Sequence, residues 1–258
     1  MKKNSFTQAF ILFITVLAFS FVHAEEAMPP PDQNVAEAWY VTPKAGMASE
    51  FEQAFKDHMK FRSSKNDPRH WDTYTPYVGD KMGFYVVRTC CVKWADLDTY
   101  MQWQNEAGTQ KHWNENVDPF VASYSHAFFK MDFENSNWGP GVEYNFVGVT
   151  QFKPKRGSGE TINALIKEMS MHAKEGGWPR NWSWSWKIGG KGGLSLVTPM
   201  KGMANMKQDP PFGKFLAEKM KSEKKAKALL DNFNAQFEYS KYMIAYHRKD
   251  MSMKMKAK

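Results

Sequence analysis

The pattern of apolar and polar positions predicts the same series of elements twice along this chain: strand, helix, strand, strand, helix, strand. Short stretches with an apolar residue at every second position, or with no polar interruption, predict strands, and apolar residues at intervals of three and four predict helices. The predicted strands of the first round are 37–42, 71–77, 84–92 and 124–133, and those of the second round are 144–152, 182–188, 194–198 and 239–247.

Each round also carries two predicted helices. Ser49 and Glu52 have the spacing of a capping box at the start of the first helix, and Asp96 is the predicted cap of the second. In the second round one helix runs through Ile162, and a single long helix covers 212–233.

The two rounds are copies of one another. The stretch 43–87 aligns with 154–198 without a gap, and the difference in residue number is constant (154 − 43 = 198 − 87 = 111). A repeat of this length is too long for a solenoid unit and matches a small domain. The sequence therefore predicts a first repeat at 37–134, a linker rich in turn-forming residues at 135–141, and a second repeat at 142–250.

This element order is that of the ferredoxin-like split βαβ unit, an antiparallel sheet with helices on one face. Two such sheets can bury their open faces against each other. This arrangement fits strands that are apolar at both odd and even positions, such as the run from Phe84 to Val87. The predicted fold class is α+β, with two ferredoxin-like repeats fused into one α/β barrel.

A stretch from Trp94 to Trp103, continuing to His112, resembles the dimeric α/β-barrel superfamily, which includes antibiotic-biosynthesis-type monooxygenases, haem-degrading monooxygenases and chlorite dismutases. The resemblance implies a pocket between each sheet and its helices. In the haem-degrading branch the His that matches His112 ligates iron and the residue that matches Trp103 lies against the porphyrin. Trp39 stands where that branch has Asn, so haem is an alternative rather than the leading prediction.

A second candidate site is a stripe of tryptophans. Trp182, Trp184 and Trp186 alternate along one strand and therefore share one face. Such a wall can bind a flat aromatic ring or an acyl chain, or it can be an ordinary aromatic core between two sheets. His172 lies on the apolar edge of the preceding helix, where it could face this wall. Trp103, His112, His172 and the three tryptophans are the candidate ligand-binding residues.

Arg69 and Arg180 occupy the same place in the two repeats, two positions before a Trp. A shared position favours a structural task, such as pairing with a carboxylate or capping carbonyl groups, and anion binding is the alternative. No catalytic residue is assigned. The sequence shows no His, Asp and Glu set with the spacing of a zinc site, so no metal is predicted unless haem binds at His112.

The stretch 1–24 has the pattern of a secretory signal peptide: a basic start, an apolar run from Ala9 to Val22, and the small-residue site Val22-His23-Ala24. Residues 25–36 follow as a proline-rich extended leader. No other apolar stretch is long enough to span a membrane. The sequence predicts an exported, soluble protein that is periplasmic or secreted.

The formal charge of +8 is concentrated at one end. Residues 214–258 carry twelve Lys and Arg against five Asp and Glu, a net of +7, and the signal peptide carries +2, which leaves about −1 for residues 25–213 (8 − 7 − 2 = −1). This distribution does not favour nucleic-acid binding. The basic residues form a solvated helix face or a docking surface for a partner, and residues 251–258 are predicted to be a frayed, exposed basic tail rich in Met and Lys.

The two cysteines, Cys90 and Cys91, are adjacent in a predicted strand. Neighbouring strand side chains point to opposite faces, which favours two separate buried thiols. A vicinal disulfide or a reactive thiol is the alternative for an oxidising compartment.

Together these features predict an exported protein that binds a small hydrophobic or aromatic molecule in a barrel pocket, with monooxygenase-like oxidation as an additional activity. The alternatives are a non-catalytic interaction module that uses the basic last helix and a haem-binding protein. A homodimer is also compatible with the sequence.

Overall fold

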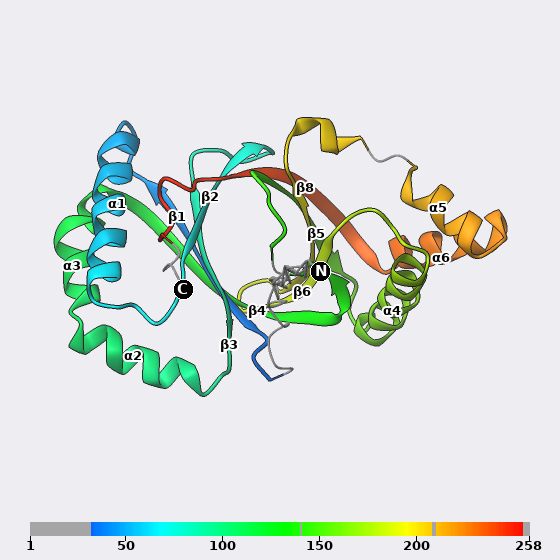
Figure 1. Ribbon diagram of the computed structural model, residues 1–258, viewed down its shortest axis with the longest axis horizontal. Helices are drawn as coiled ribbons and strands as arrows, with labels where there is room; N and C mark the ends of the chain where they lie inside the picture. Colours follow the sequence, from blue (N-terminus) through cyan, green and yellow to red (C-terminus); the bar gives the residue numbers. More distant parts are fainter. Residues whose placement is uncertain (1–31, 140, 208–209, 255–258) are drawn as a thin grey trace, which may run out of the picture.

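The computed structural model describes residues 32–139, 141–207 and 210–254. The predicted signal peptide, residues 25–31 of the predicted leader and residues 255–258 of the predicted tail lie outside these ranges. Eight antiparallel strands close into a barrel in the order β1-β3-β2-β8-β5-β7-β6-β4. Helices α1–α3 lie on one side of the barrel and α4–α6 on the opposite side (Figure 1).

Each repeat supplies four strands. The first contains β1 (Val35–Pro43), α1 (Ala48–Ser64), β2 (Asp72–Val78), β3 (Tyr85–Val92), α2 (Asp96–Glu106), α3 (Thr109–Asn116), the 3-10 turn η1 (Asp118–Phe120) and β4 (Val121–Asn137). The second contains β5 (Phe146–Pro154), α4 (Gly159–Glu175), β6 (Trp182–Ile188), β7 (Gly193–Met200), the 3-10 turn η2 (Met203–Met206), α5 (Phe212–Lys219), α6 (Glu223–Ala235) and β8 (Phe237–His247).

The internal repeat is visible in the element bounds. Strand β5 keeps the sequence offset from β1 at both of its ends (146 − 35 = 154 − 43 = 111), and α4 keeps it from α1 (159 − 48 = 175 − 64 = 111). The repeats are joined by two strand pairs, β2 with β8 and β4 with β6, which close the barrel. The predicted α+β fold, two fused ferredoxin-like repeats, is confirmed.

Successive side chains along each strand point to opposite faces of the sheet and therefore lie in different layers. One set packs against the helices, in one cluster beneath α1–α3 and another beneath α4–α6, and the other set fills the barrel interior. Val86 and Val87 show the division, since Val86 faces the interior and Val87 faces the helices, and both are buried. The strands are apolar at both odd and even positions because both of their faces are covered.

The helix boundaries differ from the sequence prediction. Helix α1 begins after Met47 without a side-chain cap, so the capping box of Ser49 and Glu52 is wrong. The Asp96 carboxylate accepts a hydrogen bond from the Lys93 backbone N–H instead of capping α2 from outside. The predicted long helix 212–233 is interrupted between α5 and α6, where Lys221 has a φ of 50° and Ser222 caps α6.

The C-terminal segment returns to the first repeat. Met251 and Met253 are buried in the cluster beneath α1–α3, so an exposed tail from residue 251 is wrong for these two residues. The Met253 N–H donates to the Trp71 carbonyl at 2.9 Å. Arg248 makes two hydrogen bonds to the Glu52 carboxylate, at 2.6 and 2.7 Å. The last residues of the second repeat therefore complete the core of the first.

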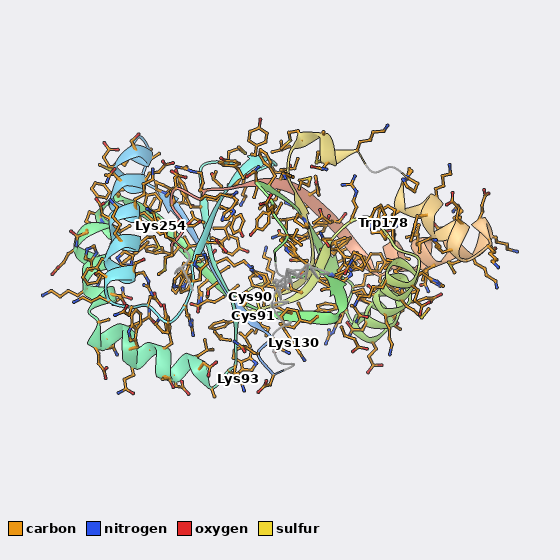
Figure 2. The ribbon with its side chains drawn as sticks, in the orientation of Figure 1. Cys90, Cys91, Lys93, Lys130, Trp178 and Lys254 are labelled. Atoms are coloured by element: carbon orange, nitrogen blue, oxygen red, sulfur yellow. A yellow bond between two sulfur atoms is a disulfide. The ribbon has the colours of Figure 1, made fainter. Side chains whose placement is uncertain are left out.

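Cys90 and Cys91 form a vicinal disulfide near the end of β3 (Figure 2). Cys90 is exposed and Cys91 is half-buried. The prediction of two separate buried thiols is therefore wrong, and the disulfide alternative holds.

Within the described ranges, no helix combines the length and apolar character that crossing a membrane requires.

Candidate functional site

A cavity of about 330 Å³ lies between the strands of the first repeat and the helices α1–α3. We call it the helix-side cavity. Its volume is within the range of about 300–1,000 Å³ that is typical of small-molecule sites. Its walls are mainly apolar and aromatic, and they are formed by Val41, Phe55, Met59, Trp71, Val87 and Trp113.

The mouth of the helix-side cavity is aromatic and polar. Trp39 is 38% exposed and its ring stacks on His126 with centroids 4.1 Å apart. Tyr124 donates a hydrogen bond to Asp118 and accepts one from the Trp113 indole N–H at 3.1 Å. Trp39, Trp113, Asp118 and Tyr124 all border the cavity, so a bound molecule would meet rings and hydrogen-bonding groups at the entrance.

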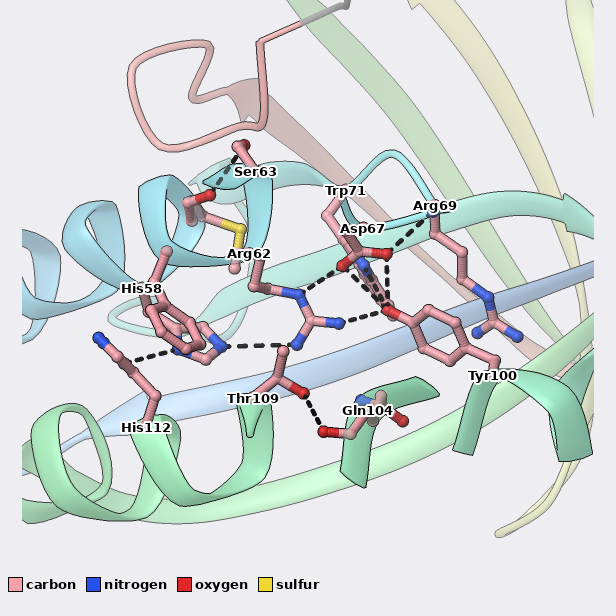
Figure 3. Close-up of polar contacts among 12 residues, drawn as sticks. His58, Arg62, Ser63, Asp67, Arg69, Trp71, Tyr100, Gln104, Thr109 and His112 are labelled. Atoms are coloured by element: carbon pink, nitrogen blue, oxygen red, sulfur yellow. Dashed lines mark hydrogen bonds and ion pairs between the residues drawn. The ribbon is translucent and has the colours of Figure 1, made fainter. Parts of the chain in front are cut away.

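A buried ion pair holds one wall in place (Figure 3). Arg62, from α1, donates from Nε to Asp67 Oδ2 at 2.7 Å and from Nη2 to the Tyr100 hydroxyl. The same hydroxyl donates to Asp67 and accepts from the Trp71 indole N–H at 3.1 Å. Burial raises the pKa of Tyr100. Because each buried charge has a partner, the network fixes the Arg62 guanidinium at the cavity.

His58 extends this network along α1. Its Nδ1 lies 3.1 Å from His112 Nδ1, and its Nε2 lies 3.5 Å from Arg62 Nη1. Burial, together with the nearby Arg62 and His112, lowers the pKa of His58 to about 3. His58 is therefore neutral at neutral pH, and one of the two facing ring nitrogens donates to the other.

Glu37, on β1, is the carboxylate of the cavity wall. Burial alone would raise the pKa of Glu37, but hydrogen bonds from His126 and Trp39 and the charge of Arg69 lower it. Arg69 Nη1 donates to Glu37 Oε2 at 2.6 Å, and the other oxygen accepts from Trp39 at 2.9 Å and from His126 at 3.0 Å. Glu37 is therefore ionised and held by three donors.

Arg69 connects the two networks. Its guanidinium carbon lies 3.6 Å from the centroid of the Tyr100 ring, and its backbone N–H donates to Asp67 Oδ1 at 2.9 Å. Arg180, the equivalent residue of the second repeat, donates instead to the backbone carbonyls of Asn205 and Lys207. The shared position thus has two different structural roles, a carboxylate partner in one repeat and a loop anchor in the other.

The predicted residues Trp103 and His112 lie beside this network but do not line the cavity. Trp103 stacks on Tyr100 with centroids 5.3 Å apart, and the Arg62 guanidinium carbon lies 5.8 Å from its ring centroid. The His112 ring stacks on Phe61 at 4.1 Å. Both residues therefore contact members of the polar network without lining the cavity.

The tryptophan stripe lies on β6 of the second repeat, whereas Trp103 and His112 lie on α2 and α3 of the first. Trp182, Trp184 and Trp186 share one face of β6, as predicted. That face packs against α4–α6 rather than against a second sheet, and Trp182 and Trp184 are buried there. A cavity of only about 140 Å³ borders these two rings. His172 is half-buried on α4 and is not among the residues that line this cavity.

Sequence reasoning missed most residues of the helix-side cavity. The helix periodicity did indicate two of these residues, because His58 and Arg62 stand one turn apart on the apolar stripe of α1 that also carries Phe55 and Met59. Polar residues on a core-facing stripe must be paired. Their partners, however, come from other elements and have no local sequence signal.

The described residues do not fit a haem held by His112. The His112 ring faces His58 and Phe61 and does not border the helix-side cavity. His58, which does border it, has His112 at one ring nitrogen and Arg62 at the other. A haem ligand needs an imidazole nitrogen that is free to face the iron. In the described ranges, no group of three His, Cys, Asp or Glu residues is arranged to hold a metal ion.

No protein-family model matches this sequence, and no curated protein matches it at a significant level. Solved structures do match. Two are each described as a "putative monooxygenase": one from Lactobacillus acidophilus NCFM (TM-score 0.52, 9% identity, 85% of this chain and 95% of that chain) and one from Fusobacterium nucleatum (TM-score 0.56, 8% identity, 84% and 93%). A third is a mutant chlorite dismutase from Candidatus Nitrospira defluvii in complex with cyanide (TM-score 0.51, 7% identity, 85% and 93%).

At such low identity the likeness concerns the fold. The chain has the dimeric α/β-barrel fold, here built from a tandem repeat within one chain, and the resemblance predicted from sequence is confirmed at the level of the fold.

Proposed function

We propose that this protein is exported and binds a small hydrophobic or aromatic molecule in the helix-side cavity. The observation that carries the proposal is the cavity of about 330 Å³ itself, with rings on its walls and a fixed set of polar groups. Aromatic walls supply rigid apolar contact area, and a few oriented polar groups supply specificity. The networks around Arg62 and Glu37 keep those polar groups in place before a ligand arrives.

Monooxygenase-like oxidation of the bound molecule is a finer version of this proposal, suggested by the names of two proteins that share the fold. An acid–base catalyst works best when its pKa is near the operating pH. His58 has a pKa of about 3, and the pKa of Glu37 is lowered from its ordinary value. The chain's own groups at the cavity therefore favour binding over acid–base catalysis.

The alternative function is a non-catalytic interaction module that uses the basic last helix. It predicts that the pockets are filled by side chains of the protein itself. The helix-side cavity does not meet this condition, and the cavity beside the tryptophans is small but present. The basic residues of α5 and α6 are mostly exposed, as in a solvated face. Small-molecule binding is for this reason the preferred function.

The binding proposal is tested by filling the cavity. Val87 faces the cavity from β3, and Val87→Phe would occupy the space that a ligand needs. Isothermal titration calorimetry with 2-naphthol, indole and octan-1-ol should show saturable binding in the wild type and, at the helix-side cavity, at least about tenfold weaker binding in Val87→Phe.

The matched control is Val78→Phe, the same substitution at a β2 residue that is 49% exposed. It should bind as the wild type does. Equal binding by Val87→Phe and the wild type, or no saturable binding of any of the three probes, would contradict the proposal. Oxygen consumption in the presence of a bound probe would instead support oxidation of the ligand.

Export is part of the same proposal and rests on the sequence from Met1 to Ala24. N-terminal sequencing of the protein from a periplasmic or culture fraction should give a chain that begins at Glu25. Recovery of the uncleaved chain in the cytoplasm would remove export from the proposal.

A further inference from the structure

A second cavity, of about 290 Å³, lies inside the barrel, on the opposite face of the strands from the helix-side cavity. We call it the lumen cavity. Strands of both repeats line it, so it exists only because the two half-sheets close on each other. Most of its wall is apolar or aromatic, with Tyr40, Val86, Phe129, Val147, Val149 and Val197 among the lining residues.

The space inside the barrel follows from the pattern of β6. Trp182, Trp184 and Trp186 point to the helices, so the intervening Ser183 and Ser185 point inward. Ser195, on β7, also points inward, and all three serines are buried. Serine is small, so three serines on adjacent strands leave room that larger side chains would fill. Among the described residues, none of these three hydroxyls has a hydrogen-bond partner.

One positively charged side chain also lines the lumen cavity. Arg88 points inward from β3, and the contact that it makes with the described residues is a long one from Nη2 to the Met131 sulfur, at 3.5 Å. Asp72, its cross-strand neighbour, also lines the lumen cavity, and one oxygen of its carboxylate, Oδ1, is bonded to His247 at 3.1 Å and to His70 at 3.3 Å. Within the described ranges, no carboxylate lies within ion-pair distance of Arg88.

The strand register brings the hydroxyls of Ser185 and Ser195 and the amide of Gln151 to one level of the barrel. The register partners of Arg88 are Ala38 and Asp72, and its guanidinium approaches that level through the Met131 sulfur. Met131, which Arg88 touches, is the partner of Ser185, and Ser185 is the partner of Ser195. Ser195 is in turn the partner of Gln151, which also lines the cavity. The lumen therefore offers two hydroxyls and an amide in one band, the Arg88 guanidinium that approaches this band and the Asp72 carboxylate, while the rest of the wall is mostly apolar.

We propose that the lumen cavity is a second binding site, for a small apolar or aromatic monocarboxylate. The carboxylate accepts hydrogen bonds from Arg88 and from the serine hydroxyls, and the apolar part of the molecule fills the space lined by valines and rings. Arg is suited to this role because its planar donors match the two oxygens of a carboxylate. The site is separate from the helix-side cavity, and its occupancy does not depend on the function proposed for that cavity.

The proposal predicts a preference for an acid over the matching alcohol. Isothermal titration calorimetry should show that the wild type binds 3-phenylpropionate at least about tenfold more tightly than 3-phenylpropan-1-ol, since a charge-assisted hydrogen bond is worth more than a neutral one. Arg88→Met should lower the affinity for the acid to that for the alcohol and leave the alcohol unchanged. Ser185→Leu, which fills the lumen, should weaken both.

Lys130→Met is the control for loss of one positive charge, because Lys130 is exposed on β4, and it should leave both affinities unchanged. Urea unfolding of each variant shows whether it remains folded, and the two lumen variants alter different properties of the site. The proposal is overturned if the wild type binds neither probe or shows no preference for the acid. It is equally overturned if Arg88→Met keeps that preference, or if Val87→Phe rather than Ser185→Leu abolishes binding, which would place the probe in the helix-side cavity.

Discussion

His58 is 1% exposed and lies between a permanently charged guanidinium and a second imidazole. A histidine in the unfolded chain takes up a proton near pH 6.5, whereas folded His58 does so only near pH 3. Between these values the unfolded state binds more protons than the folded state. The free energy of unfolding therefore falls as the pH falls from about 6.5 toward 3.

The first prediction at the scale of the residue concerns this pH dependence. Between pH 6.5 and pH 5, the His58 contribution should fall by about 1.6 kcal/mol, with a slope that approaches roughly 1.4 kcal/mol per pH unit well below pH 6.5. His58→Gln should lack this part of the slope, and His172→Gln, a half-buried histidine on α4, should follow the wild type. Urea unfolding at both pH values measures it. A His58→Gln slope equal to that of the wild type would show that burial does not hold His58 neutral.

At the scale of the element, β6 shows how one strand serves two layers. Its tryptophans pack beneath α4–α6, where Trp184 contacts the rings of Phe152 and Phe233 at centroid distances of 6.2 and 5.9 Å. Its serines face the barrel interior. The same alternation that suggested a ligand wall therefore builds a core on one side and a cavity on the other.

Removing a core tryptophan from this strand should be costly. Trp184→Ala should lower the free energy of unfolding by about 3–5 kcal/mol, because a large buried ring leaves a cavity that the surroundings fill only in part. Trp94→Ala, at a tryptophan that is 48% exposed, is the matched control and should cost less than about 1 kcal/mol. Similar losses in the two variants, measured by urea unfolding, would show that Trp184 is not a core residue.

At the scale of the whole molecule, the C-terminal segment makes the two repeats interdependent. It leaves β8, the last strand of the second repeat, and places Met251 in the core of the first. Its ion pairs reach α1, through Arg248 with Glu52 and through Asp250 with Lys56 at 2.8 Å. These partners come from opposite ends of the sequence, so only the closed barrel brings them together.

This arrangement predicts an effect of the C-terminal segment on the stability of the whole chain. Met251→Ala should lower the free energy of unfolding by about 2–5 kcal/mol, since Met251 is fully buried. Met82→Ala, at a methionine that is 56% exposed, should change it by less than about 0.5 kcal/mol. Thermal or urea unfolding measures both. If Met251→Ala were as stable as Met82→Ala, the segment would not belong to the core.

The sequence by itself determined the repeat, the order of strands and helical segments, and the face of most strand residues, with Cys90 and Cys91 as an exception. These properties are local or periodic: a constant offset between the two copies, a period of two in strands and a period near 3.6 in helices are all readable along the chain. They were enough for the fused ferredoxin-like barrel, and they placed the three tryptophans of β6 on one face.

Only the tertiary structure decided which polar side chains meet. Glu37 and Arg69 are 32 positions apart, Arg62 and Tyr100 are 38 apart, and Glu37 and His126 are 89 apart. Their pairing depends on the packing of α1 and α2 on the sheet and on the neighbouring strands of the barrel. The lumen cavity likewise requires barrel closure through β2–β8 and β4–β6. A periodic pattern specifies the face of an element, whereas a site depends on which faces of distant elements come into contact, and that is settled by packing.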